Sequence, residues 1–181
     1  TGIVALCNTY MNAAQNVTKK DKAIPSLVVF NGIDIKKYRN EKANLDFESS
    51  KLKDISKAAD EIFAIYAGSL GPNYDIPTLL EAAKILNECN SNLKIIISGA
   101  GPLHSEITQS IENYQLSNIL YLEKLDIQDL IRIYRICDIG ICAYGPGSNV
   151  AMPDKVYVYF AAGLRIANPL TGELENLLKN N

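Results

Sequence analysis

The stretch IFAIYAGSLGPNYDIPTLLEAAKILNECNSNLKIIIS, residues 62–98, decides the fold. Its two ends, residues 62–67 and 93–98, are continuous apolar runs rich in β-branched residues, as in strands that are covered on both faces of a sheet. Between them, residues 78–87 place their apolar side chains on one stripe, which predicts an amphipathic helix. Strand, helix and strand in succession predict a parallel βαβ unit.

The same alternation continues on both sides of this unit. Further strands are predicted at residues 3–6, 26–30, 119–122, 139–143 and 164–167, and further helices at residues 9–17, 127–136 and 153–163. The polar segment 36–61 is predicted to be a surface connection with one polar helix near residues 50–59. The fold class that follows is α/β, a Rossmann-like doubly wound parallel sheet with helices on both faces.

Composition narrows the range of functions. The chain has 181 residues, enough for one domain with a sizeable core, and 48% of them are hydrophobic. Its 18 basic and 20 acidic residues lack the positive excess of a nucleic-acid-binding protein, whereas a small nucleotide or sugar phosphate remains compatible. No apolar run approaches the roughly 18 residues of a membrane span, and the first residues lack a basic signal-peptide segment. We therefore expect a cytoplasmic protein.

The cysteines and the single histidine do not predict a metal centre. The four cysteines have no CxxC spacing, and His104 stands at no recognisable interval from them. We expect reduced cysteines that are mostly buried in the core, and a solvent-facing His104 one turn into a helix. The cysteines are Cys7, Cys89, Cys137 and Cys142.

Ligands of open α/β sheets bind outside the carboxyl ends of the strands, so the loops there are the candidate sites. Loop 68–75 has two glycines that let a phosphate approach the backbone, followed by a helix start. Loop 144–153 ends at Pro153, a residue favoured in the first turn of a helix. The amide groups of residues 154–156, expected to be free, and the charge of Lys155 then predict an anion site. The alternative is an ordinary capped helix with a solvated lysine.

Two other loops also admit alternatives. Turn 31–34, Asn-Gly-Ile-Asp, is compatible with a simple connection. Loop 99–102, Gly-Ala-Gly-Pro, begins like a dinucleotide fingerprint, and Glu123 could then hold a ribose diol. Against this interpretation, His104 stands where the third glycine of the fingerprint belongs.

Taken in order, these motifs resemble the C-terminal, donor-binding domain of a GT-B glycosyltransferase of the family 4 (group 1) type, particularly its polysaccharide-assembly members. The matching segments are Asn-Gly-Ile-Asp at 31–34, Gly-Ser-Leu at 68–70, Gly-Ala-Gly-Pro at 99–102, Pro-Asp-Lys at 153–155 and Tyr-Phe-Ala-Ala-Gly-Leu at 159–164. The resemblance implies one half of a GT-B fold and a retaining transferase that takes sugar from a nucleotide diphosphate.

The resemblance also implies a set of site residues. The loop from 68 to 74 would lie against the donor diphosphate, and the G-x-G-P turn would line the nucleotide pocket. The chain at 122–124 would meet the base through its backbone. The loop from 148 to 155 would hold the sugar and β-phosphate, with Lys155 stabilising the diphosphate. Position 158 corresponds to the usual ribose ligand. The residues are Gly68, Ser69, Leu70, Tyr74, Gly99, Gly101, Pro102, Leu122, Glu123, Lys124, Pro153, Asp154, Lys155 and Val158. No metal ion and no cofactor are expected, and the donor substrate would be a UDP- or GDP-linked sugar.

Several positions depart from the pattern of the family. Ser69 and Tyr74 stand where a basic pair is usual, and Val150 and Val158 stand where two glutamates are usual. Losing the ribose carboxylate removes a charge-assisted hydrogen bond worth about 1.5–3 kcal/mol. Lys155 or Lys124 would then have to supply the positive charge.

The resemblance sets expectations for the whole protein. Residues 1–22 would be the end of an N-terminal acceptor domain with its connection, and residues 23–181 a donor domain truncated at its C-terminus. The intact enzyme would transfer a hexose to a surface polysaccharide or glycolipid, in the cytoplasm or at the inner face of the membrane, and the isolated domain would be inactive. The acceptor glycan, the enzyme's own N-terminal domain and a peripheral membrane contact through that domain are the expected partners. A non-catalytic nucleotide-binding scaffold and a nucleotide-sugar epimerase of the same fold are the alternatives.

Overall fold

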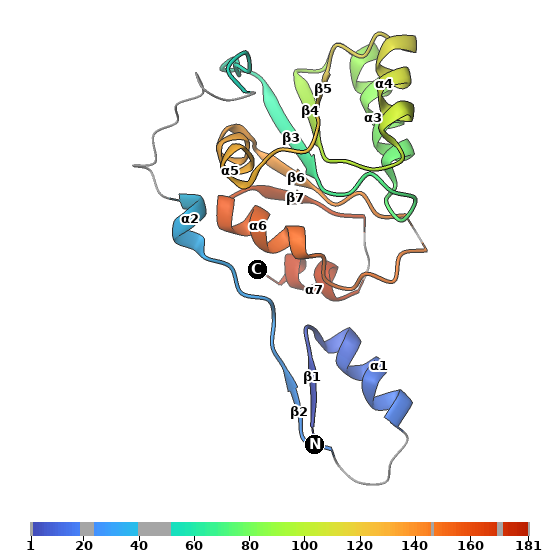
Figure 1. Cartoon of the computed structure of the whole chain (residues 1–181), viewed down its shortest axis with the longest axis vertical. Helices are drawn as coiled ribbons and strands as arrows, with labels where there is room; N and C mark the ends of the chain where they lie inside the picture. The colour runs from blue at the N-terminus through green and yellow to red at the C-terminus, as the bar shows by residue number, and fades with distance from the viewer. Residues whose placement is uncertain (1, 19–23, 40–51, 146, 170–171, 181) are drawn as a thin grey trace.

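The body of the molecule is a parallel five-stranded sheet (Figure 1). The computed structural model describes residues 2–18, 24–39, 52–145, 147–169 and 172–180. The strand order is β5-β4-β3-β6-β7, and every neighbouring pair is parallel. The strands are β3 (Ile62–Ala67), β4 (Leu93–Ser98), β5 (Ile119–Leu122), β6 (Ile139–Ile141) and β7 (Arg165–Ala167). The α/β, doubly wound prediction is confirmed.

Helices cover both faces of this sheet, each face with its own apolar core. Alternate residues of β3 point to opposite faces, so Phe63 and Ile65 enter one core while Tyr66 enters the other. The Tyr66 face is covered by α3 (Ile76–Glu88) and α4 (His104–Asn113). The Phe63 face is covered by α5 (Ile127–Ile136), α6 (Asp154–Ala162), α7 (Glu173–Lys179) and the short α2 (Ile35–Arg39).

The helix ends carry the caps that their sequences suggest. The Asp75 side chain accepts a hydrogen bond from the Thr78 amide at the start of α3, and Asp126 accepts from the amides of Gln128 and Asp129 at the start of α5. Helix α6 ends at Gly163, whose φ of +80° is easily adopted only without a Cβ. These caps fix where each helix leaves the strand end before it.

Chain direction creates a crevice between β3 and β6. From β3 the chain winds outward through β4 to β5, then returns to place β6 on the other side of β3. The loops that follow β3 and β6 therefore diverge at a topological switch point, where ligands bind in open α/β sheets. The candidate loops 68–75 and 144–153 lie on the two sides of this crevice.

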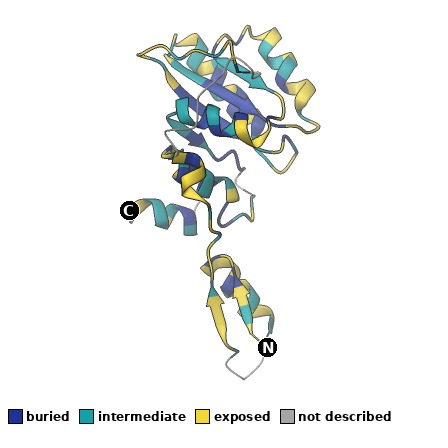
Figure 2. Ribbon diagram, turned by 60° about the vertical axis from the view of Figure 1, so that its left-hand side comes forward, coloured by how far each residue is buried: buried dark blue, intermediate teal, exposed yellow. Residues whose placement is uncertain are grey.

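The first residues form a separate unit, here called the N-terminal βαβ unit. It consists of β1 (Ile3–Ala5), α1 (Asn8–Thr18) and β2 (Ser26–Val28), and within the described part of the chain its two strands pair only with each other. The strand expected at 26–30 is therefore present but not part of the main sheet. Figure 2 shows the unit projecting from the body with largely exposed strands. Val4 is 70% and Leu27 is 60% exposed.

The prediction of a polar helix near residues 50–59 is wrong for the described residues. Residues 52–54 and 59 lie in turns and residues 55–58 have no regular secondary structure, whereas residues 50 and 51 of the predicted polar helix lie outside the described residues. Leu52 is fully buried in the core beside α5 and α6, so this part of the connection is anchored and not a surface segment. The sequence analysis also did not include α2 and α7. In the described part of the chain, no helix is long and apolar enough to span a membrane.

Candidate functional site

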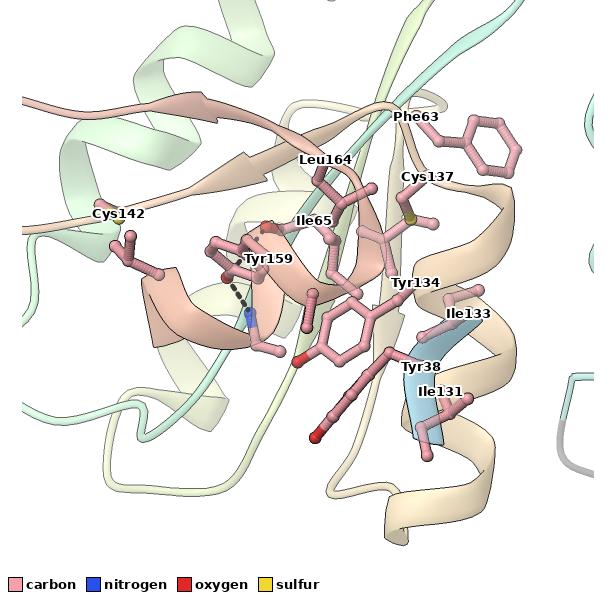
Figure 3. Close-up of a cluster of buried hydrophobic side chains, with 14 of the residues drawn as sticks. Tyr38, Phe63, Ile65, Ile131, Ile133, Tyr134, Cys137, Cys142, Tyr159 and Leu164 are labelled. Atoms are coloured by element: carbon pink, nitrogen blue, oxygen red, sulfur yellow. Dashed lines mark hydrogen bonds between the residues drawn. The ribbon is translucent and has the colours of Figure 1, made fainter. Parts of the chain in front are cut away.

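Tyr159 fixes helix α6 against the sheet (Figure 3). Its hydroxyl lies 3.3 Å from the carbonyl oxygen of Ile65 and 3.2 Å from that of Ile141, and it accepts a hydrogen bond from the Ala67 amide at 3.3 Å. Its ring lies over Gly140, where a Cβ would approach the ring carbons to 2.3 Å. A buried tyrosine on α6 thus bonds to both β3 and β6, which sets the position of the whole helix.

Lys155 lies one turn before Tyr159, on the same face of α6. Its Nζ is buried, and within the described residues it has no hydrogen-bond partner. Three tyrosine rings surround it: their centroids lie 4.2 Å (Tyr66), 4.8 Å (Tyr74) and 5.1 Å (Tyr144) from Nζ. We call these three residues the tyrosine cage. Burial of the ammonium lowers the pKa of Lys155 to about 8.

The loop after β3 passes directly over this lysine. A Cβ at position 68 would lie 3.1 Å from Lys155 Nζ, so Gly68 leaves the room that the ammonium occupies. The Tyr66 hydroxyl donates to the carbonyl oxygen of Ser69 at 2.6 Å and holds the loop in place. The cation predicted at the start of α6 and the glycine predicted to admit a phosphate are therefore in contact.

The glycines of the 99–102 turn allow the two loops to pack together. A Cβ at position 99 would lie 1.8 Å from the carbonyl oxygen of Gly68, and a Cβ at position 101 would lie 2.3 Å from that of Leu70. Gly101 also has a backbone φ of +156°, which residues other than glycine rarely adopt. The G-x-G pattern is thus explained by backbone packing against the β3 loop.

Two pockets share lining residues with the surroundings of Lys155. The first has a volume of about 360 Å³ and shares Gly68 with the lysine contacts; it is lined by Ala67, Gly68, Ser69, Ser98, Gly99, Ala100, Lys124, Leu125, Leu130 and Tyr134. The second has a volume of about 700 Å³ and shares Tyr74 and Tyr144 with the tyrosine cage; it is lined by Pro72, Asn73, Tyr74, Asp75, Pro77, Tyr144, Gly145, Gly147, Ser148, Asn149 and Val150. Lys155 itself is not among the lining residues of either pocket, but each pocket is lined by residues that contact its ammonium.

The structure brings part of the expected set together. Besides Lys155, five of the expected residues contact its ammonium or line one of the two pockets, and these are Gly68, Ser69, Tyr74, Gly99 and Lys124. Gly101 supports the same loops without lining either pocket. Pro153 forms the N-cap of α6, and the Val156 amide donates to its carbonyl, so this amide is not free as expected.

The other expected residues line neither of the two pockets. Leu70 is fully buried, and its backbone bonds to Ala100 and Leu103. The Leu122 carbonyl accepts from the Gly99 amide, and the Glu123 carbonyl accepts from the Ser98 hydroxyl. Pro102 is exposed outside both pocket linings, Asp154 accepts from the Asn31 side chain at 2.6 Å, and Val158 is half-buried against the apolar core.

His104 and the cysteines lie outside the candidate site. His104 begins α4, where we expected it one turn later; it is exposed, and its Nδ1 lies 2.9 Å from the Tyr121 hydroxyl. Cys7, Cys137 and Cys142 are buried and Cys89 is exposed, all with free thiols. Burial raises the pKa of Cys137 to about 12, which makes it a poor nucleophile. The described residues contain no cluster of His, Cys, Asp and Glu able to hold a metal ion.

Of the aromatic residues of the site, only Tyr74 was expected from the sequence, whereas Tyr66, Tyr144 and Tyr134 were not. Tyr66 lies near the carboxyl end of β3, Tyr144 follows β6, and Tyr134 projects from α5 into the first pocket. A signal was present, because Tyr66, Tyr74 and Tyr144 all lie in or after two strands that end at the switch point. Their convergence on one lysine depends on β3 and β6 being neighbours.

The comparisons with known proteins agree with this fold and these motifs. The family model described as glycosyl transferases group 1 matches residues 48–145, more than half of the chain. The chitobiosyldiphosphodolichol beta-mannosyltransferase of Yarrowia lipolytica is 26% identical over 140 residues, 75% of this chain and 30% of that protein. The O-antigen chain mannosyltransferase C of Escherichia coli is 24% identical over 136 residues, 75% of this chain and 33% of that protein.

Solved structures share the architecture. A glycosyltransferase from Rickettsia africae superposes with a TM-score of 0.72 at 18% identity, covering 98% of this chain and 46% of that one. Anabaena HepE, crystallised with UDP-glucose, superposes with a TM-score of 0.66 at 16% identity, covering 91% of this chain and 43% of that one. The chain spans about a third of the length of the curated relatives it matches and under half of these structures. The strand order, the motifs at the strand ends and the family match together show that the chain belongs to the group 1 glycosyltransferases.

Proposed function

We propose that this chain is the donor-binding half of a retaining glycosyltransferase that uses a UDP- or GDP-linked hexose. The observation that carries the proposal is the environment of Lys155: among the described residues its buried cation has no anionic partner, its neighbours line two pockets, and it lies at the start of a helix. A nucleotide sugar has the matching order of parts, with a diphosphate between a nucleoside and a sugar.

In this arrangement each part of the donor has its own surroundings. The nucleoside occupies the pocket with Lys124 and Tyr134, and the diphosphate lies along Gly68 and Ser69 toward Lys155 and the α6 N-terminus. The sugar occupies the pocket with Tyr74, Ser148 and Asn149, whose aromatic and hydrogen-bonding groups suit a carbohydrate. As the leaving diphosphate gains charge, Lys155 and the helix dipole stabilise it without a metal ion.

The relatives favour a hexose donor and a lipid-linked or polysaccharide acceptor. Both curated relatives described above are named as mannosyltransferases, one acting on a dolichol-linked substrate and one on O-antigen chains. Transfer to a surface polysaccharide or glycolipid at the cytoplasmic face of a membrane is in keeping with these names. We place the acceptor site and any catalytic group of the acceptor side on a second, N-terminal domain.

The N-terminal βαβ unit supports the existence of such a partner domain. Its two parallel strands have no other strand beside them among the described residues, and its apolar side chains Val4, Leu27 and Val29 are exposed. A parallel sheet is normally covered on both faces. Because β2 pairs with β1, we place the boundary of the donor domain after β2 instead of at residue 22.

Nucleotide binding to the 181-residue chain tests the proposal. Titration calorimetry with UDP and GDP is expected to detect one of them, and Lys155→Met is expected to weaken it about 10- to 100-fold, since a charge-assisted contact is worth about 1.5–3 kcal/mol. Lys84→Met, on α3 and outside both pocket linings, is the matched control and leaves the affinity unchanged. EDTA also leaves it unchanged. No binding of either nucleotide at millimolar concentration, or equal binding by Lys155→Met, contradicts the proposal.

A non-catalytic scaffold is the second candidate, and Val158 favours it. The position lies half-buried against the apolar core, and no carboxylate lines the first pocket. Val158→Glu separates the two candidates, because restoring a ribose ligand raises nucleotide affinity strongly in a decayed site. A change smaller than about twofold instead indicates a site that is built differently and remains in use.

A further inference from the structure

The buried ammonium of Lys155 presents a problem for the proposed site. Its Nζ has essentially no solvent-exposed surface, although a diphosphate must touch it to be neutralised by it. Among the described residues no carboxylate forms an ion pair with it, and its titratable neighbours are the three phenols of the tyrosine cage and the Cys142 thiol. A donor can therefore reach Nζ only if part of its surroundings moves.

Two of the three cage rings are fixed. Tyr66 is fully buried in β3, and its hydroxyl donates to the Ser69 carbonyl. Tyr144 is only 7% exposed and follows β6 directly. Moving either ring would disturb a strand or the loop it holds.

Tyr74 differs from both. It is half-buried, it lies in the loop between Gly71 and the α3 cap Asp75, and its hydroxyl makes no hydrogen bond within the described part of the chain. Its ring also lines the pocket of about 700 Å³, so there is open space beside it. A rotation of the side chain into that space needs no change in a strand or a helix.

We propose that Tyr74 is a gate over Lys155, whose ring covers the ammonium before the donor binds and turns into the adjoining pocket when a diphosphate arrives. This inference rests on the proposed function for the identity of the ligand, but the covering of Lys155 can be tested without any nucleotide. In the turned position the ring lies in the pocket assigned to the sugar, where it can pack against the face of a hexose. Tyr74 then acts as a positioning residue at both stages.

Amine labelling measures the gate directly. The chain is treated with limiting acetic anhydride near neutral pH, and the modification rate of each lysine is followed by peptide mass spectrometry. In the wild-type chain Lys155 is expected to react at least tenfold more slowly than Lys179, whose side chain is 69% exposed. A pKa near 8 would make an accessible amine react faster, so slow labelling reports covering and not protonation.

Variants assign the covering to Tyr74. Tyr74→Ala is expected to raise the Lys155 rate at least fivefold, whereas Tyr74→Phe, which keeps the ring, stays as slow as wild type. Tyr114→Ala is the matched control, because it removes a ring at the end of α4 that lies 4.5 Å from the Nζ of another lysine, Lys84, and leaves Lys155 unchanged. Circular dichroism confirms that each variant is folded.

The outcomes are distinct. Rapid labelling of Lys155 in the wild-type chain overturns the gate, and so does a folded Tyr74→Ala variant in which the rate does not rise. If the gate variants behave as expected, UDP or GDP should slow the labelling of Lys155 in Tyr74→Ala by occupying the opened site. Failure of both nucleotides to bind counts against the proposed function alone, since the labelling rates already decide the gate.

Discussion

Lys155 is an energetically unusual residue. Burying an ammonium without a hydrogen-bond acceptor costs several kcal/mol, and the three tyrosine rings offset only part of this, about 2 kcal/mol for a desolvated cation–π contact. A side chain that lowers the stability of the fold without a structural benefit is expected where the function needs it.

This cost gives a pH-dependent prediction. The pKa of Lys155 is about 8 in the folded chain and near 10.5 when exposed, so between these values the unfolded chain binds more protons. The destabilisation caused by Lys155 should therefore shrink as the pH rises from about 8 to 10, while below pH 8 the full penalty remains. Lys155→Met lacks the penalty, so we expect its free energy of unfolding to exceed that of wild type by about 1–3 kcal/mol at pH 7, and by less at pH 9.5.

Urea unfolding at the two pH values measures this difference, with Lys84→Met as the control because its parent lysine is not buried. A difference between wild type and Lys155→Met that stays constant across the window would show that the ammonium is not titrating in the fold. Together with the loss of nucleotide affinity, a more stable variant would mark Lys155 as a residue kept for binding.

At the scale of elements, the packing of the β3 loop on the 99–102 turn is the tightest backbone contact near the site. We expect Gly99→Ala to lower the free energy of unfolding by more than 2 kcal/mol, because a Cβ at this position would lie 1.8 Å from the Gly68 carbonyl oxygen. Gly71→Ala is the matched control, since nothing lies within 4 Å of its Cβ position. Chemical denaturation of both variants makes the comparison, and equal stabilities would contradict the close approach.

Elements with strong local signals were predictable from the sequence. Strands β4 and β5 and helix α5 begin and end at the expected residues, because each has a continuous apolar run or a clear amphipathic stripe. The polar segment before β3 misled, because its charged composition outweighed Leu52, whose burial depends on α5 and α6. The pairing of β2 with β1 was also not visible, since strand partners are set by tertiary packing and not by local pattern.

The candidate site was predictable to the same extent. Lys155 and Gly68 followed from local rules for helix starts and glycine loops, and the structure brings them into contact. The tyrosine cage required knowing that β3 and β6 are neighbours in the sheet. The family pattern also misplaced Leu70, whose side chain fills the core under the loop.

At the scale of the whole molecule, the N-terminal βαβ unit is joined to the body close to the candidate site. The Tyr10 hydroxyl accepts a hydrogen bond from the Ala151 amide at 3.2 Å, and the Asn31 side chain donates to Asp154. Both partners belong to the segment that leads into Lys155. Movement of the unit relative to the body would therefore be felt first in the loop assigned to the sugar.

Glu173, at the start of α7, makes the strongest contact between the body and the N-terminal βαβ unit. Its carboxylate accepts from the Asn8 and Thr9 amides, each at 2.8 Å, and so caps the N-terminus of α1 from another element. Burial alone would raise its pKa, but these hydrogen bonds outweigh burial and lower the pKa to about 2. The carboxylate contributes its stability above the ordinary pKa of about 4.5, and this contribution is lost as the pH falls from 4.5 toward 2.

Removing this contact should loosen the unit. We expect Glu173→Ala to lower the free energy of unfolding by about 1 kcal/mol at pH 7, the usual value of a lost helix cap, and by less at pH 3. Hydrogen exchange at the Asn8 and Thr9 amides should accelerate at pH 7, while exchange within β3 and β4 stays slow. Glu175→Ala is the matched control, because it removes a carboxylate from the same turn of α7 that pairs only with Lys179 among the described side chains. Unchanged exchange in α1 of Glu173→Ala would mean that other contacts hold the unit to the donor domain.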